Sequence, residues 1–163
     1  MKNNHTYEEN GYPRENNTRL ARVLDKSRAD ELNAISEYLY LSIMFEKSIP
    51  WLSKLFEEIS MDEMQHFHAL SGMMRDLGVN PTVNVKSSSS RLDLMKDASC
   101  RCEAEAPRVL EDLLRDEKNA ENEYLRLRTL APTMEIKNAL TEIAEDEYAH
   151  RDALNDALKQ FNK

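Results

Sequence analysis

The chain has 163 residues, of which 32% are charged, three are Gly and five are Pro, and its net charge is −8. This length predicts one domain, and so few helix breakers among many Glu, Leu, Ala, Lys and Arg predict an all-α protein. The negative charge argues against nucleic acid as a partner, because phosphates attract basic surfaces. The sequence contains no apolar run long enough for a membrane span and no secretory signal, so we expect a cytoplasmic protein without a membrane partner. Cys100 and Cys102 are expected to be reduced thiols rather than a metal or redox pair.

Residues 1–17 are polar, which predicts a flexible N-terminal arm ahead of a helical bundle over residues 18–163. Thr18 can cap the first helix, whose apolar residues recur at intervals of three and four as in a bundle seam. Pro50 suits the first turn of the second helix, and Gly78 suits the position after its end. The four long helices are predicted at about residues 18–48, 50–77, 107–131 and 134–161.

The middle of the chain separates these helices into two pairs. Residues 79–90 contain an Asn-Pro pair and a run of four serines, and they predict a loop or crossover. Residues 91–106 predict a short helix that Pro107 interrupts. Because the first and last connections are short and the middle one is long, we expect two antiparallel helix pairs joined by a long crossover.

Two Glu-x-x-His units interrupt the apolar stripes of the second and fourth long helices. They are Glu63 with His66 and Glu147 with His150. Residues three apart on a helix share one face, and the apolar neighbours on that face predict that it is buried. A carboxylate and an imidazole in a core need a strong partner, because burying an unpaired charge is costly. Two such units therefore predict a pair of metal ions rather than surface hydrogen bonding.

The two halves of the chain repeat one another at these positions. The repeated segments are residues 31–38 and 117–124, and residues 62–66 and 146–150. In each half, one helix carries an inward Glu and the next helix carries an inward Glu-x-x-His unit. A pseudo-twofold arrangement of the halves would bring four carboxylates and two imidazoles to one level of the core, as in dinuclear metal sites of four-helix bundles.

Four segments carry a resemblance that covers all four long helices, and they are residues 30–39, 61–66, 117–120 and 145–150. They resemble the rubrerythrin and bacterioferritin branch of the ferritin-like superfamily. The resemblance implies a ferritin-like four-helix bundle that holds two Fe ions, or alternatively two Mn ions, at an oxygen-activating site. One Glu-x-x-His unit would be a weak signal in so Glu-rich a chain, whereas two units with two further Glu in register are specific.

The resemblance implies roles for six residues, which are the candidate metal ligands and catalytic residues. Glu63 and Glu147 would bridge the two metal ions. The remaining pairs would each complete the coordination of one ion, and they are Glu31 with His66 and Glu117 with His150.

Four further residues are predicted to support these ligands. Asp62 and Asp146 each precede a Glu-x-x-His unit, and the resemblance implies that each accepts a hydrogen bond from the His of the opposite unit. Tyr38 and Tyr124 are also candidate catalytic residues, and they lie about two helical turns after the inward Glu of their own helices. Each hydroxyl could donate to a ligand carboxylate, and plain core packing is the alternative.

One position departs from the rubrerythrin pattern. Rubrerythrins carry a fifth carboxylate three residues after the ligand of the third helix, and that position here is Ala120. Glu121 is the candidate substitute, and the alternative is a solvated Glu beside a basic residue. His68 is expected at the surface or at an interface, because it lies about 200° around the helix from His66.

These residues predict a non-haem dinuclear-metal oxidoreductase with H2O2 or O2 as its substrate. Peroxide reduction in the manner of rubrerythrin is the leading interpretation, with a separate electron-donor protein because the Cys-x-x-Cys pairs of a rubredoxin module are absent. Iron oxidation by a ferritin-like protein, a di-manganese catalase and a degenerate scaffold are the alternatives. Few residues follow His150, and no further helix of a bacterioferritin cage fits there, so we expect a homodimer.

Overall fold

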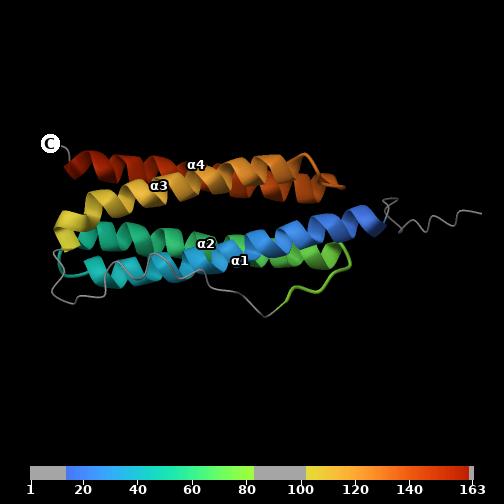
Figure 1. The fold of residues 1–163 in the computed structure, drawn as a ribbon, viewed down its shortest axis with the longest axis horizontal. Helices are drawn as coiled ribbons and strands as arrows, with labels where there is room; N and C mark the ends of the chain where they lie inside the picture. Colours follow the sequence, from blue (N-terminus) through green and yellow to red (C-terminus); the bar gives the residue numbers. More distant parts are fainter. Residues whose placement is uncertain (1–13, 83–101, 162–163) are drawn as a thin grey trace, which may run out of the picture.

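The computed structural model of the chain describes residues 14–82 and 102–161. These residues form four helices and no strand: α1 (Arg14–Phe45), α2 (Pro50–Asp76), α3 (Cys102–Arg128) and α4 (Met134–Phe161) (Figure 1). The all-α prediction is therefore confirmed. None of these described helices combines the length and the apolar character that crossing a membrane requires.

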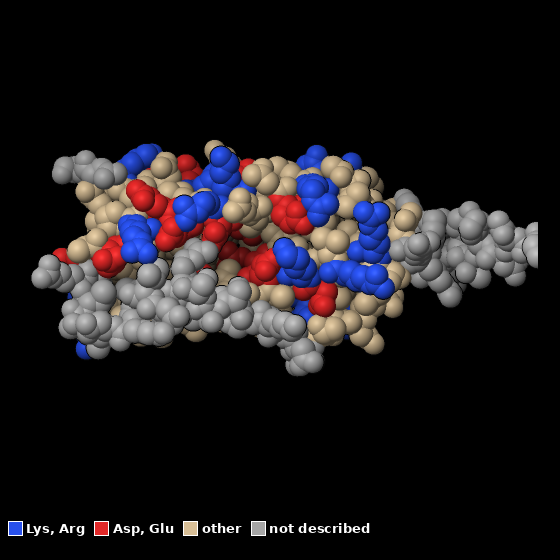
Figure 2. Space-filling view, viewed as in Figure 1, with Lys and Arg blue, Asp and Glu red and all other residues tan. Residues whose placement is uncertain are grey.

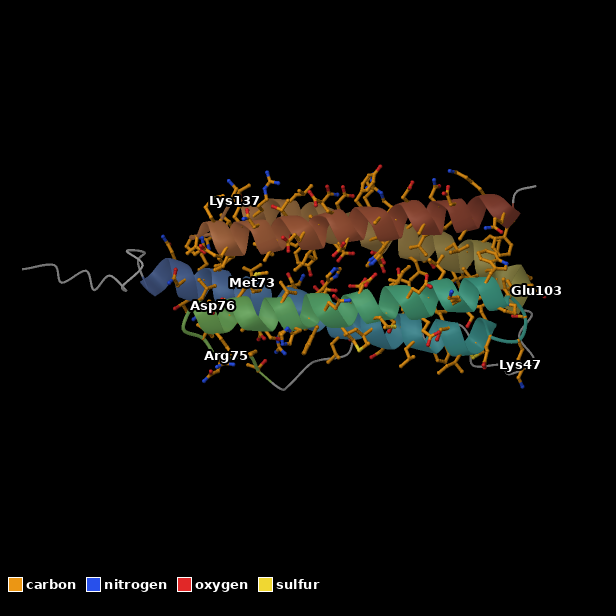
Figure 3. All side chains as sticks on the ribbon, turned by 180° about the vertical axis from the view of Figure 1, so that it is seen from behind. Lys47, Met73, Arg75, Asp76, Glu103 and Lys137 are labelled. Atoms are coloured by element: carbon orange, nitrogen blue, oxygen red, sulfur yellow. The ribbon has the colours of Figure 1, made fainter. Side chains whose placement is uncertain are left out.

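The helices form two antiparallel pairs, α1 with α2 and α3 with α4 (Figure 1). In Figure 3, Glu103 near the start of α3 lies at the same end of the bundle as Lys47, which follows α1, whereas Asp76 at the end of α2 lies at the opposite end. The end of α2 and the start of α3 therefore lie at opposite ends of the bundle, as the predicted crossover requires. Residues 83–101, with Cys100 and most of the predicted short helix, lie outside the described residues.

The start of α1 differs from the prediction. The helix begins at Arg14, so residues 14–17 are helical rather than part of an arm, and Thr18 lies inside the helix instead of capping it. Asn17 is buried, which shows that the packed face of α1 extends into this polar segment. A polar segment without Gly or Pro can continue a helix when one of its residues reaches the packed face. Residues 1–13 of the predicted arm lie outside the described residues.

The connection between α1 and α2 is a tight turn. α1 ends at Phe45, earlier than predicted, and the amide of Ile49 donates to the carbonyl of Phe45 at 2.8 Å. Pro50 occupies the first turn of α2, where its missing N–H has no helical partner to lose. At the other end of α2, Gly78 has a φ of 79° and its amide donates to the carbonyl of Arg75 at 2.9 Å. The left-handed conformation explains why a glycine ends this helix.

α3 is longer at its start than predicted. It begins at Cys102 and continues through Pro107, so the predicted break at this proline is wrong. Proline removes one backbone hydrogen bond. Ala106 and Leu110 on either side of it are fully buried, and their packing holds the helix together across this position. The helix ends at Arg128 rather than near residue 131.

Two apolar clusters fill the bundle on either side of a polar layer. The first includes Leu24, Leu70, Leu127 and Leu140, and the second includes Phe45, Phe56, Leu110 and Leu154. Tyr124 belongs to the first cluster and Tyr38 to the second. The buried acidic and imidazole side chains lie between the clusters. Apolar burial on both sides therefore offsets the cost of a polar layer in the core.

Candidate metal centre

Six side chains selected from the sequence meet in the middle of the bundle. α1 and α3 each contribute one Glu, while α2 and α4 each contribute one Glu and one His. All six are between 1% and 5% exposed, and they are Glu31, Glu63, His66, Glu117, Glu147 and His150. The spacing of three residues places the Glu and His of each unit on the inward face of their helix. Apolar residues before and after each unit keep that face in the core.

The six side chains form two overlapping groups. One group contains Glu31, Glu63, His66 and Glu147, and the other contains Glu63, Glu117, Glu147 and His150. Within each group, one potential ligand atom from every residue lies within 4.8 Å of all the others. Glu63 and Glu147 belong to both groups. This arrangement could hold two metal ions side by side with two carboxylates shared between them.

Both imidazoles turn Nδ1 toward the carboxylates. Nδ1 of His66 lies 2.9 Å from Glu63 and 3.3 Å from Glu147. Nδ1 of His150 lies 3.3 Å from Glu63 and 3.7 Å from Glu147. Each Nδ1 has a third carboxylate nearby. Glu31 lies 4.0 Å from Nδ1 of His66, and Glu117 lies 3.5 Å from Nδ1 of His150. The two ring centroids are 5.8 Å apart, and each imidazole belongs to one of the two ligand groups.

The other nitrogen of each imidazole lies near an acid of the opposite helix pair. Nε2 of His66 lies 3.3 Å from Oδ2 of Asp146, and Nε2 of His150 lies 3.4 Å from Oδ2 of Asp62. The two Asp side chains are 59% and 50% exposed, so water can solvate their charge. A carboxylate at Nε2 favours a proton on that nitrogen. In the neutral imidazole, this tautomer leaves the lone pair on Nδ1, which faces the group.

Two buried tyrosines connect the helix pairs at the same level. The hydroxyl of Tyr38 donates to Oε1 of Glu117, and the hydroxyl of Tyr124 donates to Oε1 of Glu31. Both hydrogen bonds cross between α1 and α3. They leave Oε2 of each Glu turned toward the imidazole of its own group.

Burial and hydrogen bonding divide the four carboxyl groups into two classes. Burial and the neighbouring charge of Glu63 raise the pKa of Glu31 well above its ordinary value, and burial raises the pKa of Glu117 to about 8. Burial also opposes ionisation of Glu63 and Glu147. The two imidazoles, 2.9–3.7 Å away, outweigh burial and hold the pKa of both Glu below the ordinary value. The shared carboxylates are therefore ionised, whereas the two unshared carboxyl groups favour their protonated form.

The positive charge of the two imidazoles balances the negative charge of the shared carboxylates. Burial lowers the pKa of His66, but the carboxylates of Glu147 and Glu63, 3.3 and 2.9 Å from its Nδ1, outweigh burial and raise this pKa to about 10. The pKa of His150 is likewise raised above its ordinary value, because the carboxylates of Glu117, Glu147 and Glu63, 3.3–3.7 Å from its Nδ1, outweigh burial. Two imidazolium ions then face two carboxylates, and the buried layer is neutral as a whole.

Three buried polar atoms of the centre have ionisable neighbours at 3.3–3.7 Å but form no hydrogen bond of good geometry among the described residues. They are Oε2 of Glu117, Oε1 of Glu147 and Nδ1 of His150. Such orphans are rare in folded proteins, and each one calls for an explanation. All three belong to one group, and carboxylate oxygen with imidazole nitrogen is a donor set that suits Fe or Mn. The residues present therefore fit a metal ion.

Glu121 does not reach the centre. Its carboxylate pairs with Arg151 on α4, whose guanidinium carbon lies 4.8 Å from the ring centroid of Tyr148. Glu121 belongs to neither ligand group, and its pairing with Arg151 corresponds to the alternative of a Glu beside a basic residue. The reason is helical geometry, because Glu121 lies about 100° around α3 from Ala120. His68 is exposed, as predicted, and lines a second groove, between α2 and α4, that also reaches His66 and Asp146.

A cavity of about 510 Å³ between α1 and α3 leads to the carboxylates of the centre. Figure 2 shows acidic side chains gathered in a hollow on this face of the bundle. The acids at the mouth of the cavity are Asp30, Glu37, Asp116 and Glu123. These acids were not among the residues predicted from the sequence, although a signal was present. The pattern Asp-Glu-x-Asn-Ala-x-x-Glu-Tyr occurs in full at residues 30–38 and again at residues 116–124, and it is longer than the ligand set requires.

Comparisons with known proteins agree with this architecture. The family model of the ferritin-like domain matches residues 22–163. The structure of the Desulfovibrio desulfuricans bacterioferritin matches with a TM-score of 0.71 and 20% sequence identity, over 91% of this chain and 83% of that chain. That bacterioferritin has a di-iron site and was reduced in solution and allowed to reoxidise before crystallisation. No curated protein sequence matches the chain. The prediction of a ferritin-like four-helix bundle is thus confirmed.

Proposed function

The chain belongs to the ferritin-like domain family, and from this premise we propose that it is a dinuclear iron oxidoreductase that oxidises Fe(II) with O2. One observation carries the proposal. Two buried groups of ligand-type residues share Glu63 and Glu147 and contain polar atoms that form no hydrogen bond among the described residues. The di-iron site of the bacterioferritin with the same fold supports iron as the metal.

The residues of the centre have separate tasks in this proposal. Each group would hold one ion, with Glu63 and Glu147 between the two ions. Bound Fe(II) supplies the redox chemistry, because each ion can give one electron to the oxidant. The hydroxyl of Tyr38 donates to Oε1 of Glu117, and the hydroxyl of Tyr124 donates to Oε1 of Glu31. These hydrogen bonds hold the two carboxyl groups that the ions do not share. The two acids behind the imidazoles orient the rings and keep Nδ1 available.

The charges of the centre suit two divalent cations. Glu63 and Glu147 are ionised and face two imidazolium groups, while Glu31 and Glu117 favour their protonated forms. Two divalent cations can replace the four protons held by the two imidazolium groups and by Glu31 and Glu117 without changing the net charge of the layer. A buried layer that stays neutral avoids the large free-energy cost of an unpaired charge. This balance supports reversible loading of the centre.

Iron oxidation has more support than peroxide reduction, which the sequence alone favoured. The acidic cavity between α1 and α3 offers a cationic substrate a path to the centre. The additional carboxylate expected of a rubrerythrin is not supplied, since Ala120 has no carboxylate and Glu121 pairs with Arg151. A di-manganese centre would use the same donor atoms, and metal analysis separates the two cases. A homodimer and a separate electron donor remain predictions.

Anaerobic titration with Fe(II), followed by metal analysis, should find about two ions per chain. The loaded protein is then mixed with O2 or with H2O2 in a stopped-flow instrument while ferric absorbance is recorded. A faster reaction with O2 and continued oxidation of added Fe(II) are expected. No Fe(II) binding would overturn the proposal. A much faster reaction with H2O2 would favour the peroxidase, and O2 release from peroxide by a manganese-loaded protein would favour the catalase.

A further inference from the structure

Two methionines of α2 lie largely outside the packed core. Met61 and Met64 are 55% and 49% exposed, whereas Met73 and Met74 on the same helix are buried in the first apolar cluster. A methionine stabilises a protein mainly by filling gaps in its core, and an exposed one gains little of that free energy. Packing therefore does not explain the two exposed thioethers.

A histidine shares the helix face of these methionines. Met61, Met64 and His68 follow one another at intervals of three and four residues, and such intervals place side chains on one face of a helix. Long side chains in a helix lean toward its N-terminus, so His68 leans toward Met64, and Met64 leans toward Met61. The imidazole of His68 is exposed, and no described residue forms a hydrogen bond or an ion pair with it. Two thioether sulfurs and one uncommitted imidazole thus occupy neighbouring positions.

All three side chains line the second groove, between α2 and α4. The wall that α4 contributes includes Ala139 and Ile143, so apolar atoms border the groove on that side. The exposed acid Glu142 also lines the groove, and its negative charge attracts cations. The groove therefore presents soft donor atoms and a favourable potential to a metal ion.

These donors are separate from the dinuclear centre, although the groove also reaches His66 and Asp146. Nδ1 of His66 faces Glu63 at 2.9 Å, and Nε2 faces Asp146 at 3.3 Å, so neither nitrogen is available to the groove. The six ligand-type residues of the centre offer oxygen and nitrogen atoms and no sulfur. The donor set of the groove thus differs in kind from that of the centre.

We propose that Met61, Met64 and His68 form a binding site for a soft monovalent metal ion, with Cu(I) as the natural ion. Thioether sulfur is a soft ligand that selects Cu(I), and imidazole also suits copper. The carboxylates and imidazoles of the centre suit Fe or Mn instead, so the two sites select different ions. The inference goes beyond the proposed function and does not depend on it.

Binding can be measured in full-length Cys100→Ser/Cys102→Ser protein, because thiols would otherwise compete for the ion. Anaerobic titration with Cu(I) against a chromophoric chelator should find about one ion per chain. Met61→Leu/Met64→Leu, which removes both sulfurs at nearly constant volume, should weaken binding about 10-fold or more, because even groups behind metal ligands contribute about 10- to 100-fold. The matched control is Met134→Leu, at an exposed methionine that does not line the groove. No binding in the parent protein, or equal binding in both Leu variants, would overturn the proposal.

The position of the ion can be tested with Ag(I), which is diamagnetic and prefers the same soft ligands. In the same Cys-free protein with NMR-labelled methionine methyl groups, added Ag(I) should shift the signals of Met61 and Met64 and leave that of Met134 unchanged. The shifts should persist after Glu63→Gln/Glu147→Gln, which disables the dinuclear centre. Loss of the shifts in that variant, or an equal shift at Met134, would overturn the proposal. Failure of the proposed function would appear as absent Fe(II) binding and would leave these shifts in place.

Discussion

The two helix pairs are alike at the centre, and each completes the site of the other. Tyr38 in the first pair donates to Glu117 in the second, and Tyr124 donates to Glu31 in return. The contacts between imidazoles and Asp side chains cross between the pairs in the same way. Both ligand groups also need a shared Glu from each pair. Neither pair by itself therefore contains a complete group.

Away from the centre the pairs differ. In the second pair, Arg151 pairs with Glu121 and lies over the ring of Tyr148. The equivalent positions of the first pair hold Phe67, Ile35 and Met64. The first pair has an arginine contact of its own, with Arg28 lying 5.0 Å from the ring centroid of Phe67. The halves thus match where both contact the same centre and differ where each contacts only its own neighbours.

The largest effect should come from the residues that the halves share. Glu63→Gln/Glu147→Gln is expected to weaken binding of both ions by more than about 100-fold, because even residues behind metal ligands contribute about 10- to 100-fold. Anaerobic Fe(II) titration with metal analysis measures the loss. His66→Ala and His150→Ala serve as the comparison, and each should retain about one ion per chain. Loss of both ions in only one of these His variants would show that the half-sites are not equivalent.

The next largest effect tests the two apolar clusters. Leu70 and Leu154 occupy equivalent positions of the repeat, lie in different clusters and are fully buried. Either Leu→Ala variant should lower the free energy of unfolding by about 3–5 kcal/mol, because the transfer free energy is lost and a cavity remains. Urea denaturation of the metal-free protein measures it. Leu130→Ala, at an exposed residue, should change stability by less than about 0.5 kcal/mol. A large difference between the two core variants would show that one cluster dominates.

A smaller effect is expected behind the imidazoles. Asp62→Asn and Asp146→Asn should each weaken the binding of one ion by about 10- to 100-fold, because each Asp orients one imidazole. Since the contacts cross, Asp62→Asn should affect the ion held by His150, and Asp146→Asn the ion held by His66. Calorimetric titration with Fe(II) resolves the two ions. Asp156→Asn should leave both affinities unchanged. An equal loss of affinity in all three variants would show that the change in net charge, and not the orientation of an imidazole, weakens binding.

The smallest effect is expected at Asp25, which is half-buried. The residue at the equivalent position of the second half, Glu111, is exposed. Partial burial opposes ionisation of Asp25, but hydrogen bonds from Arg28 and Thr82 outweigh it and hold its pKa below the ordinary value. A lowered native pKa adds stability above the unfolded pKa of about 3.9, and that stability is lost as the pH falls through the native value.

Asp25→Asn should therefore lower the free energy of unfolding by about 1 kcal/mol or less at pH 6 and by almost nothing below about pH 3. Urea denaturation across this range measures the difference from wild type. Glu111→Gln should show no such dependence on pH. A constant difference for Asp25→Asn at every pH would mean that the side chain acts through packing rather than charge.

Helix faces could be predicted from the sequence, whereas helix ends could be predicted only in part. The stripe around Glu63 and His66 repeats with the period of a helix, and that period decides which face is buried. Pro107 shows the limit, because its local preference is to end a helix. Packing of Ala106 and Leu110 outweighs that preference, and packing involves residues that are distant in the sequence.

Glu121 shows a second limit. Its sequence position allowed either a ligand or a surface pair, and only its neighbour on another helix, Arg151, decides between the two. The mouth residues Asp30 and Asp116 were missed for a related reason. Each is an ordinary acid on a Glu-rich helix until the two helices face one another across a cavity.

By itself, the sequence determined which side chains point inward, since a regular helix places residues three and four apart on one face. It thereby determined the candidate ligands and the repeat that pairs them. Only the tertiary structure decided which inward residue meets which, as when Tyr38 meets Glu117 and His66 meets Asp146. It also decided that Ala34 leaves a cavity open above the centre. These relations join segments far apart in the chain, and no local periodicity encodes them.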